Sequence, residues 1–346
     1  MIKEVLLDSE KERIVKFLET FSLKYEDDIT KTFYAEEDGE ITSTVSLSND
    51  LIKCFAVKEE SQSTGVSGEI ITYAISYLNS IGINSYHVYT KPKYEKVFTS
   101  FGFKKIEETD KVMLLEGGIS SIDDKLLDLK KTIENTIGKI SDESDIAAVV
   151  ANANPITNGH IALIEKASQE HDVVLLFILE EERSVFTFKE RIGMAYLATR
   201  RLPNVIVLPS TQYLVSYLTF PGYFLKDNDE KSIEYARIDA LIFKDYFMKR
   251  LYIKKRYIGS ESKDYMVTYN EILHDVLGDS VVEIERIKED KEVVSASTVR
   301  KLLEEKKFSE AEKYIPRESL LIFRMSGADK YGRWHSIFKR KIIKSS

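Results

Sequence analysis

The sequence predicts two α/β domains: a first domain that mixes short strands and helices, and a second with a doubly wound parallel sheet. The chain has 346 residues, more than the ~100–200 residues of one ordinary domain. A helical pattern near residues 119–140 separates two regions of different character. Beyond it, buried apolar runs alternate with helical patterns, which is typical of βαβ units and a parallel sheet.

The first region, residues 1–116, combines short strands with helices. Apolar residues recur at helical spacing in Ser9–Phe21 and Glu69–Ser80. The predicted strands are Thr42–Leu47, Leu51–Val57, Tyr86–Thr90 and Val112–Leu115. A loop rich in small residues joins one of these strands to the second helix. Backbone N–H groups at a helix start suit an anion, but glycine and serine also occur in such loops simply to turn the chain.

A connecting helix follows Gly117-Gly118, where the last strand of the first region is expected to end. Apolar residues recur at helical spacing from Ile122 to Ile140, and two aspartates near the start suit the positive end of the helix dipole. The predicted organisation is a first domain at 1–116, a connecting helix at 117–144, a second domain at 145–325 and a basic tail at 326–346.

The second domain alternates strands and helices regularly. Predicted strands are Ile146–Val150, Val173–Leu179, Val205–Leu208, Tyr257–Gly259 and Val281–Ile287. Predicted helices are His160–Glu170, Phe188–Arg201, Ile233–Leu251 and Thr268–Leu277. In such sheets ligands bind beyond the carboxyl ends of the strands. The turn after the first of these strands is therefore the first candidate site.

That turn has the residues of a phosphate-binding site. Pro155 and Gly159 shape a tight passage from strand to helix. Thr157 offers a hydroxyl near the helix start, and His160 falls in the first turn, where the dipole and unbonded N–H groups favour phosphate. An imidazole donor there would stabilise charge that develops on an α-phosphate. The alternative is that Asn154, Thr157 and His160 only cap a helix.

A second polar group begins a helix late in the domain. Ser295, Ser297 and Thr298 precede an apolar helical pattern, and Arg300 follows within the first turns. Hydroxyls, helix N–H groups and a guanidinium together suit β- and γ-phosphates. An ordinary serine cap with a solvated arginine is the alternative.

These two segments together resemble motifs of the nucleotidyltransferase superfamily. Thr157-Asn158-Gly159-His160 matches its T/H-x-G-H turn after the first strand, and Ser295–Arg300 matches its late helix start. Threonine in the first position of the turn is a variant found within the superfamily. The resemblance implies a doubly wound α/β domain that catalyses attack on the α-phosphate of a nucleoside triphosphate and releases pyrophosphate.

The resemblance narrows to the citrate lyase ligases on the run VVANANPITNGHIALIEKA and several shorter stretches. Those stretches are Phe186–Arg191, Thr219–Phe224, Ile238-Asp239, Gly259–Glu261 and Tyr269-Asn270. The similarity covers about residues 1–325. Members of that family carry an acetyltransferase-like (GNAT) domain before the nucleotidyltransferase domain. Gln62–Ser67 resembles the pyrophosphate loop of the GNAT fold, and Phe101–Phe103 resembles its late turn. The implied fold is a GNAT-like α+β domain followed by a Rossmann-like parallel sheet.

The family resemblance implies a reaction for the second domain. It would bind ATP with Mg²⁺ and activate acetate as acetyl-adenylate. Thr157 and His160 would be catalytic, holding the α-phosphate. The implied ATP-binding set is Asn154, Thr157, His160, Gly259, Ser297, Thr298 and Arg300. Because a carboxylate is already ionised at neutral pH, no side chain need act as a strong base.

The acceptor of the acetyl group follows from the same resemblance. The thiol would belong to the phosphoribosyl-dephospho-coenzyme A arm on the acyl carrier subunit of citrate lyase. The arm's pyrophosphate is expected at the small-residue loop of the first domain, on Gln62, Gly65, Ser67 and Gly68. The loop departs from the family pattern at Ser67, where glycine or alanine is usual.

Three other functions stay open on the sequence. The first is a plain adenylyltransferase that acts on a phosphorylated small molecule such as pantetheine phosphate. The second is a protein N-acetyltransferase that uses acetyl-CoA through the first domain. The third is a non-catalytic docking or regulatory protein. The extra first domain and the segment Thr219–Phe224 argue against the first, and intact Thr157, His160 and Arg300 argue against the third.

Composition excludes several classes. The net charge of −7 argues against a general nucleic-acid binder. The one cysteine, Cys54, cannot form an intramolecular disulfide and fits a buried strand in a reducing compartment. We see no secretory signal, no apolar run of ~20 residues and no metal-ligand spacing, so we expect a cytoplasmic protein without a membrane span or structural metal. The basic tail, 326–346, could touch the acidic carrier subunit or a membrane surface, or be a solvated terminus.

Overall fold

The chain forms two compact units. The computed structural model describes residues 2–182, 184–216, 219–261, 264–285, 288–289, 292–293 and 295–331. Unit 1 comprises the described residues up to Lys125 together with Pro221–Ile238. Unit 2 comprises Leu126–Phe220 and the described residues from Asp239 onward. The segment 221–238, which the sequence had assigned to the second domain, therefore packs as part of the first unit.

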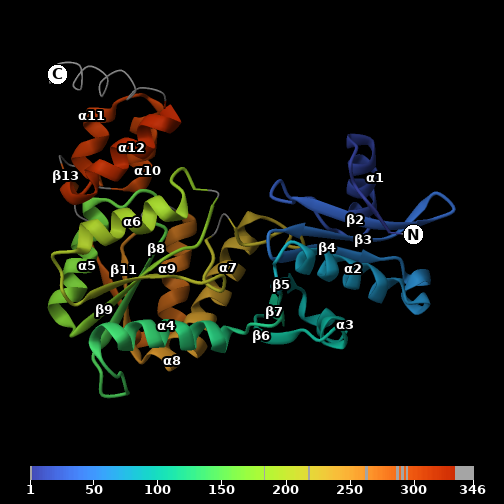
Figure 1. Ribbon diagram of the computed structural model, residues 1–346, viewed down its shortest axis with the longest axis horizontal. Coiled ribbons are helices and arrows are strands. Elements are labelled where there is room, and N and C mark those ends of the chain that lie inside the picture. Colours follow the sequence, from blue (N-terminus) through green and yellow to red (C-terminus); the bar gives the residue numbers. More distant parts are fainter. Residues whose placement is uncertain are drawn as a thin grey trace. The chain divides into compact units, whose positions relative to one another are not determined.

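Unit 1 is built on a seven-stranded mixed sheet in the order β1-β2-β3-β4-β5-β7-β6 (Figure 1). The strands are β1 Ile2–Glu4, β2 Lys31–Glu37, β3 Glu40–Ser48, β4 Leu51–Val57, β5 Ser85–Thr90, β6 Lys104–Glu108 and β7 Met113–Gly118. The helices are α1 Asp8–Glu19, α2 Val66–Ser80 and α3 Glu95–Ser100. On α2, Ile70, Ile71, Ala74 and Leu78 are all fully buried in the core against the sheet. This apolar stripe at helical spacing fixes which face of α2 meets the strands.

Strands β4 and β5 are the parallel pair of the sheet, and they separate after their first residues. Pairing is limited to Leu51 with His87 and Ile52 with Val88. A register shift in β4 accompanies Cys54, whose φ is +51°. Such a bulge bends the strand away from its neighbour.

Tyr223, from the inserted segment, bridges the two strands where they separate. Its hydroxyl donates a 2.8 Å hydrogen bond to the carbonyl oxygen of Tyr89 on β5 and also bonds the backbone of Cys54 on β4. The backbone N–H of Lys24 donates to the Tyr223 carbonyl at 2.8 Å. Burial holds the phenol pKa of Tyr223 well above its usual value, so the hydroxyl stays protonated and can donate.

The connecting helix, α4, spans Ile122–Ile137, close to its predicted range. Gly138 follows this helix with φ +89°. Glycine readily adopts this left-handed conformation, which commonly ends a helix. Strand β7 ends at Gly118, as the sequence predicted, although it runs through Gly117 and Gly118 rather than stopping at Leu115. A Cβ atom on Gly117 would lie 2.5 Å from the ring of Tyr86, so this glycine allows a ring to cover the strand.

Unit 2 is built on a five-stranded sheet in which every pairing is parallel, as the sequence predicted (Figure 1). The order is β10-β9-β8-β11-β12. The strands are β8 Ile146–Ala151, β9 Val173–Ile178, β10 Val205–Pro209, β11 Ile253–Gly259 and β12 Val281–Ile284. The main helices are α5 Asn158–Glu170, α6 Phe188–Thr199, α9 Asp264–Leu277, α10 Ala296–Glu304 and α12 Leu320–Tyr331. Helix α7, Asn228–Ile242, begins in unit 1 and enters unit 2 at Asp239. Short helices α8 Lys249–Leu251 and α11 Phe308–Ala311 and the antiparallel pair of β13 Lys288–Glu289 with β14 Glu292–Val293 complete it.

Side chains cover both faces of this sheet. On β9, Val174, Leu176 and Ile178 join a core with residues of α5, α6 and α10. Phe177 points to the other face, where its ring meets Phe247 edge-on at 5.6 Å between centroids. The strand order reverses between β8 and β11, and a reversal of this kind opens a crevice at the carboxyl ends. No helix in the described part of the chain is long and apolar enough to cross a membrane.

Candidate phosphate-binding site

The turn between β8 and α5 lies at the strand-order reversal of unit 2. Thr157 precedes α5 with extended backbone (φ −127°, ψ 167°), and its carbonyl accepts the first helical bond from Ile161 N–H at 3.1 Å. Since the first N–H groups of a helix have no partner within the helix, the start of α5 presents donors and positive potential at this edge. This is the environment predicted for Thr157 and His160.

His160 is held in one tautomer by its own helix start. The backbone N–H of Thr157 donates to Nδ1 of His160 at 3.1 Å. A backbone N–H can only donate, so Nδ1 is the acceptor and the ring proton belongs on Nε2. The hydroxyl of Thr157 lies 2.8 Å from the same Nδ1. The ring therefore carries an N–H donor on its far side, as a phosphate site requires.

Thr157 itself is fully buried. With its hydroxyl beside Nδ1 and its backbone N–H bonded to the same atom, it orients the ring of His160. This geometry favours a positioning role for Thr157 over direct contact with a ligand, a distinction that the sequence does not make.

Arg300 joins the two sequence motifs, which are far apart in the chain. Its Nη1 donates to the carbonyl oxygen of Asn154 at 2.6 Å, and its Nη2 donates to the hydroxyl of Ser297 at 3.1 Å. The buried side chain of Asn154 accepts from the backbone N–H of Phe186 at 3.1 Å, so the turn is anchored on both sides. The fold thus brings Asn154, His160, Ser297 and Arg300 to one place.

The start of α10 is capped by a serine. The hydroxyl of Ser295 accepts from the backbone N–H of Thr298 at 3.1 Å, and the two hydroxyl oxygens lie 2.9 Å apart. Ser295 is therefore the cap. Ser297 and Thr298 lie in the first turn and are half-buried. A second helix start, with a guanidinium beside it, faces the turn that carries His160.

Gly259 ends β11, the strand next to β8. Its carbonyl accepts from Asn270 Nδ2 at 3.0 Å, and the following N–H, of Ser260, donates to Ile284 on β12 at 2.8 Å. Gly259 thus lies at the same carboxyl edge as the β8–α5 turn. Among the described residues, no hydrogen bond joins Gly259 to the other predicted site residues.

Arg191, which the sequence analysis does not name as a site residue, stabilises the β8–α5 turn through hydrogen bonds to Asn152. It is fully buried, and its Nη1 donates to the carbonyl and side-chain oxygens of Asn152 at 2.7 and 2.9 Å. Burial lowers its pKa, while the buried carboxylate of Glu181 opposes that shift. The signal was available in the sequence: Arg191 shares the apolar stripe of α6 with Met194, Ala195 and Ala198. An arginine on a buried stripe requires specific partners.

The predicted loop of unit 1 forms a 3-10 turn, Glu59–Thr64, that leads through Gly65 into α2. Gly65 has φ +83°, which favours glycine. Ser67 and Gly68 lie in the first turn of α2, where Gly68 N–H donates to the Gly65 carbonyl at 3.0 Å. The side chain of Gln62 lies outside the described residues. An anion at this loop stays a prediction.

The arrangement in unit 2 can bind a polyphosphate and stabilise charge on it. Two helix starts, a neutral imidazole donor and a guanidinium meet at the carboxyl edge of a parallel sheet. The described residues contain no group of three or more His, Cys, Asp or Glu side chains placed to hold a metal ion.

The mixed sheet of unit 1 and the parallel sheet of unit 2 give the chain an acetyltransferase-like part and a nucleotidyltransferase-like part. The family model for the citrate lyase ligase C-terminal domain matches residues 146–323, and the acetyltransferase (GNAT) domain model matches residues 5–115. The chain belongs to the citrate lyase ligase family. The predicted fold class is confirmed.

Two ligases are similar to this chain over most of its length. A [citrate [pro-3S]-lyase] ligase of Haemophilus influenzae is 32% identical over 318 residues, which cover 89% of this chain and 93% of that protein. The ligase of Klebsiella pneumoniae is 28% identical, covering 92% and 95%. A phosphopantetheine adenylyltransferase of Symbiobacterium thermophilum is 36% identical over 71 residues, which cover 20% of this chain and 44% of that protein.

Proposed function

We propose that this chain uses ATP to acetylate the thiol arm of a citrate lyase acyl carrier subunit and thereby activates citrate lyase. Two full-length relatives carry the name of that ligase. The observation that carries the proposal is the position of Arg300, which bonds Asn154 and Ser297 and so joins the two phosphate-binding motifs into one site. We place ATP and acetate at this site in unit 2.

The first step is attack on the α-phosphorus. An acetate oxygen forms the new P–O bond, the bond from Pα to the oxygen bridging to Pβ breaks, and pyrophosphate leaves. Acetate needs no general base because it is ionised at neutral pH. The Nε2–H of His160 donates to an α-phosphate oxygen, where negative charge develops. Arg300 and the first turn of α10 hold the departing pyrophosphate.

Magnesium would arrive with the ATP phosphates, which supply hard oxygen ligands. Ser297 and Thr298 would contribute hydroxyls from the first turn of α10, and Gly259, at the end of β11, is the proposed backbone contact for the nucleotide. Thr157 holds His160 in the required tautomer.

The second step transfers the acetyl group to sulfur. The carrier thiol, as thiolate, attacks the carbonyl carbon of acetyl-adenylate, the carbon–oxygen bond to AMP breaks, and AMP leaves with its electron pair. The thiol proton passes to solvent. The thioester is the product. Gln62, Gly65, Ser67 and Gly68 in unit 1 are the proposed contacts for the arm's pyrophosphate.

The test is pyrophosphate release from Mg-ATP with acetate, measured with and without the thiol form of the carrier. We expect pyrophosphate release to depend on acetate and to continue only while unacetylated carrier remains. We also expect the mass spectrum to show acetylated carrier. Release that requires a phosphorylated small molecule and ignores acetate would contradict the proposal.

A second candidate is adenylyl transfer to pantetheine phosphate. The partial match to a phosphopantetheine adenylyltransferase favours testing it. The same assay with pantetheine phosphate in place of acetate distinguishes the two, because the product is then dephospho-coenzyme A and no acetyl group is consumed.

A further inference from the structure

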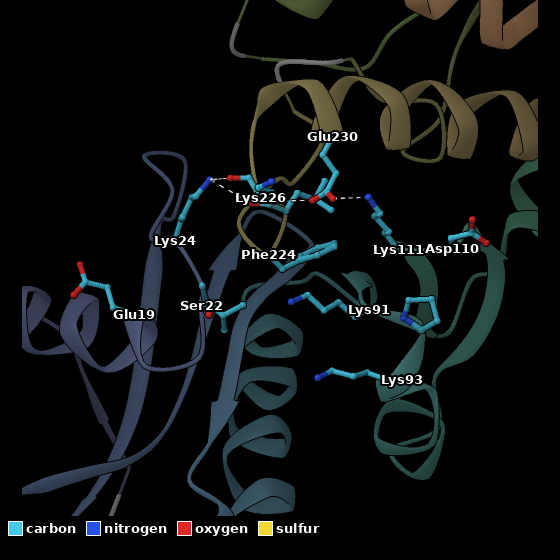
Figure 2. Close-up of a pocket in the computed structure, with 13 residues that line it drawn as sticks. Glu19, Ser22, Lys24, Lys91, Lys93, Asp110, Lys111, Phe224, Lys226 and Glu230 are labelled. Atoms are coloured by element: carbon cyan, nitrogen blue, oxygen red, sulfur yellow. Dashed lines mark hydrogen bonds and ion pairs between the residues drawn. The ribbon is translucent and has the colours of Figure 1, made fainter.

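Unit 1 contains a pocket of about 730 Å³ that none of the predicted residues lines. Its walls come from the loop after α1, the loop after β5, the β6–β7 loop and the inserted segment 221–238 (Figure 2). Apolar surface comes from Leu23, Pro92, Phe224 and Leu225. The volume falls within the ~300–1,000 Å³ of pockets that take a small molecule.

Lysines dominate the charge of this pocket. The cationic side chains that line it are Lys24, Lys91, Lys93, Lys111 and Lys226, against the carboxylates of Glu19, Asp110 and Glu230. Five positive and three negative groups leave a local excess of two positive charges, on a chain whose net charge is −7. A positive pocket on a negative protein attracts anionic ligands selectively.

Two of these lysines build the pocket wall. Lys24 Nζ donates to the carbonyls of Leu225 and Lys226 at 3.3 and 3.1 Å. Lys111 Nζ pairs with Glu230 at 2.6 Å. These three bonds tie the inserted segment to the body of unit 1, so they help to fix the shape of the pocket.

Lys91 and Lys93 are available to a ligand. They lie two residues apart in the loop after β5, and Figure 2 shows their side chains extending in the same direction, toward the part of the pocket that contains Ser22. Within the part of the chain that the structure describes, Lys91 and Lys93 form no ion pair with a carboxylate, whereas Lys226 interacts electrostatically with Glu230. Lys93 Nζ lies 4.8 Å from the ring centroid of Tyr94, an exposed residue.

We propose that this pocket binds a phosphate-bearing ligand with an apolar portion, whose phosphates lie against Lys91, Lys93 and Lys226 and whose apolar portion lies on Phe224 and Leu225. Ammonium groups bind phosphate as point charges. If the proposed function holds, the ligand is the phosphorylated thiol arm of the carrier. The pocket would then be a second contact for that arm, in addition to the loop at Gly65.

The test measures binding of coenzyme A, as a phosphate-bearing thiol probe, to the full-length chain by isothermal titration. A saturating non-hydrolysable ATP analogue fills the site in unit 2 throughout. We expect the double variant Lys91→Glu, Lys93→Glu to bind at least tenfold more weakly. The control is the double variant Lys96→Glu, Lys104→Glu, which reverses the same number of charges on exposed residues of α3 and β6 outside the pocket and should bind as the wild type does. Wild-type affinity should fall as salt rises.

Equal coenzyme A affinity in the double variant and the wild type would overturn the proposal. The source of the ligand is tested with carrier protein that has or lacks its arm. Binding of the armed form alone identifies the arm, and equal binding of both forms overturns the proposal in favour of an acidic protein surface. Acetate-dependent exchange of pyrophosphate into ATP by the wild type tests the proposed function separately, because its absence would not affect coenzyme A binding.

Discussion

At the scale of single residues, the two nitrogens of His160 have different tasks. Nδ1 accepts from the Thr157 backbone and so completes the start of α5, while Nε2 carries the proton that the proposed chemistry uses. A substitution that removes both nitrogens would confound helix capping with catalysis. Asparagine separates the two effects, since its Oδ1 can occupy the position of Nδ1 and nothing replaces Nε2–H.

For His160→Asn we expect acetate-dependent exchange of pyrophosphate into ATP to fall ~10²–10³-fold, the usual loss for one charge-stabilising donor. The melting temperature should stay near the wild-type value because the acceptor for Thr157 N–H remains. The exchange assay and differential scanning fluorimetry measure these two quantities. A variant with wild-type exchange would remove His160 from the mechanism.

Cys54 should be chemically inert in the folded protein. It is fully buried, and burial raises the pKa of its thiol to about 12. At pH 8 roughly one molecule in ten thousand would carry the thiolate, which is the reactive form. Iodoacetamide should therefore fail to label the native chain at pH 8 but label it in urea, where the pKa returns to ~8.5. Mass spectrometry measures the label, and rapid native labelling would contradict the assigned environment.

The raised thiol pKa of Cys54 also makes the free energy of unfolding depend on pH. A thiol whose pKa is raised by folding contributes stability that is fully present below the unfolded value, ~8.5, and is lost as pH rises toward the folded value of about 12. Cys54 thus favours unfolding of unit 1 under alkaline conditions and has no such effect at neutral pH.

At the scale of elements, a buried ion pair ties two helices of unit 2 to β11. Arg256 on β11 donates from Nη2 to Asp239 of α7 at 3.0 Å and to the hydroxyl of Tyr269 of α9 at 2.7 Å. Tyr269 donates to Asp239 at 2.7 Å, and burial raises its pKa so that it stays protonated. The Arg256 guanidinium also lies 4.4 Å from the ring centroid of Phe243.

Asp239→Ala should destabilise unit 2 by ~3–5 kcal/mol, because it leaves the Arg256 charge buried without its carboxylate partner. The matched control is Asp245→Ala, which removes a partly exposed i,i+4 pair with Lys249 and should cost only ~0.3–0.5 kcal/mol. Urea unfolding followed by circular dichroism measures both. Equal midpoints for the two variants would contradict the structural role given to the triad.

Most elements of unit 2 were predictable because its parallel strands are buried on both faces and form continuous apolar runs. Strand β2 of unit 1, Lys31–Glu37, was missed. Its apolar centre is only Phe33, Tyr34 and Ala35, and charged residues occupy its ends. This segment forms a strand because it pairs on both sides, with β1 and β3. The local sequence does not reveal such pairing with distant segments.

At the scale of the whole molecule, residues 221–238 belong to unit 1 although they lie between elements of unit 2 in the sequence. Tyr223, Phe224 and Leu225 are buried there. Gly222 N–H donates to Glu26 Oε1 at 3.0 Å, and Glu26 in turn pairs with the buried Lys53 at 2.9 Å. The two units are therefore not separable by one cut in the chain.

A fragment that begins at residue 126 should aggregate, because it exposes Tyr223, Phe224 and Leu225, each worth ~1.5–3 kcal/mol when buried. Replacing these three residues by serine should restore a soluble fragment that exchanges pyrophosphate into ATP but does not acetylate the carrier. Size-exclusion chromatography and the two activity assays measure this. A monomeric fragment with the native segment would contradict the assignment of 221–238 to unit 1.

The sequence by itself determined the parallel sheet of unit 2, the connecting helix and the positions of the two motifs proposed to bind phosphate, Thr157–His160 and Ser295–Arg300. These rest on local periodicity and on residues adjacent in the chain, such as Thr157 and His160. The tertiary structure decided that Arg300 bonds the turn at Asn154, that Arg191 supports it and that Tyr223 bridges β4 and β5. Each of these contacts joins residues distant in sequence, and their partners are set by how buried polar groups are satisfied after the chain has folded.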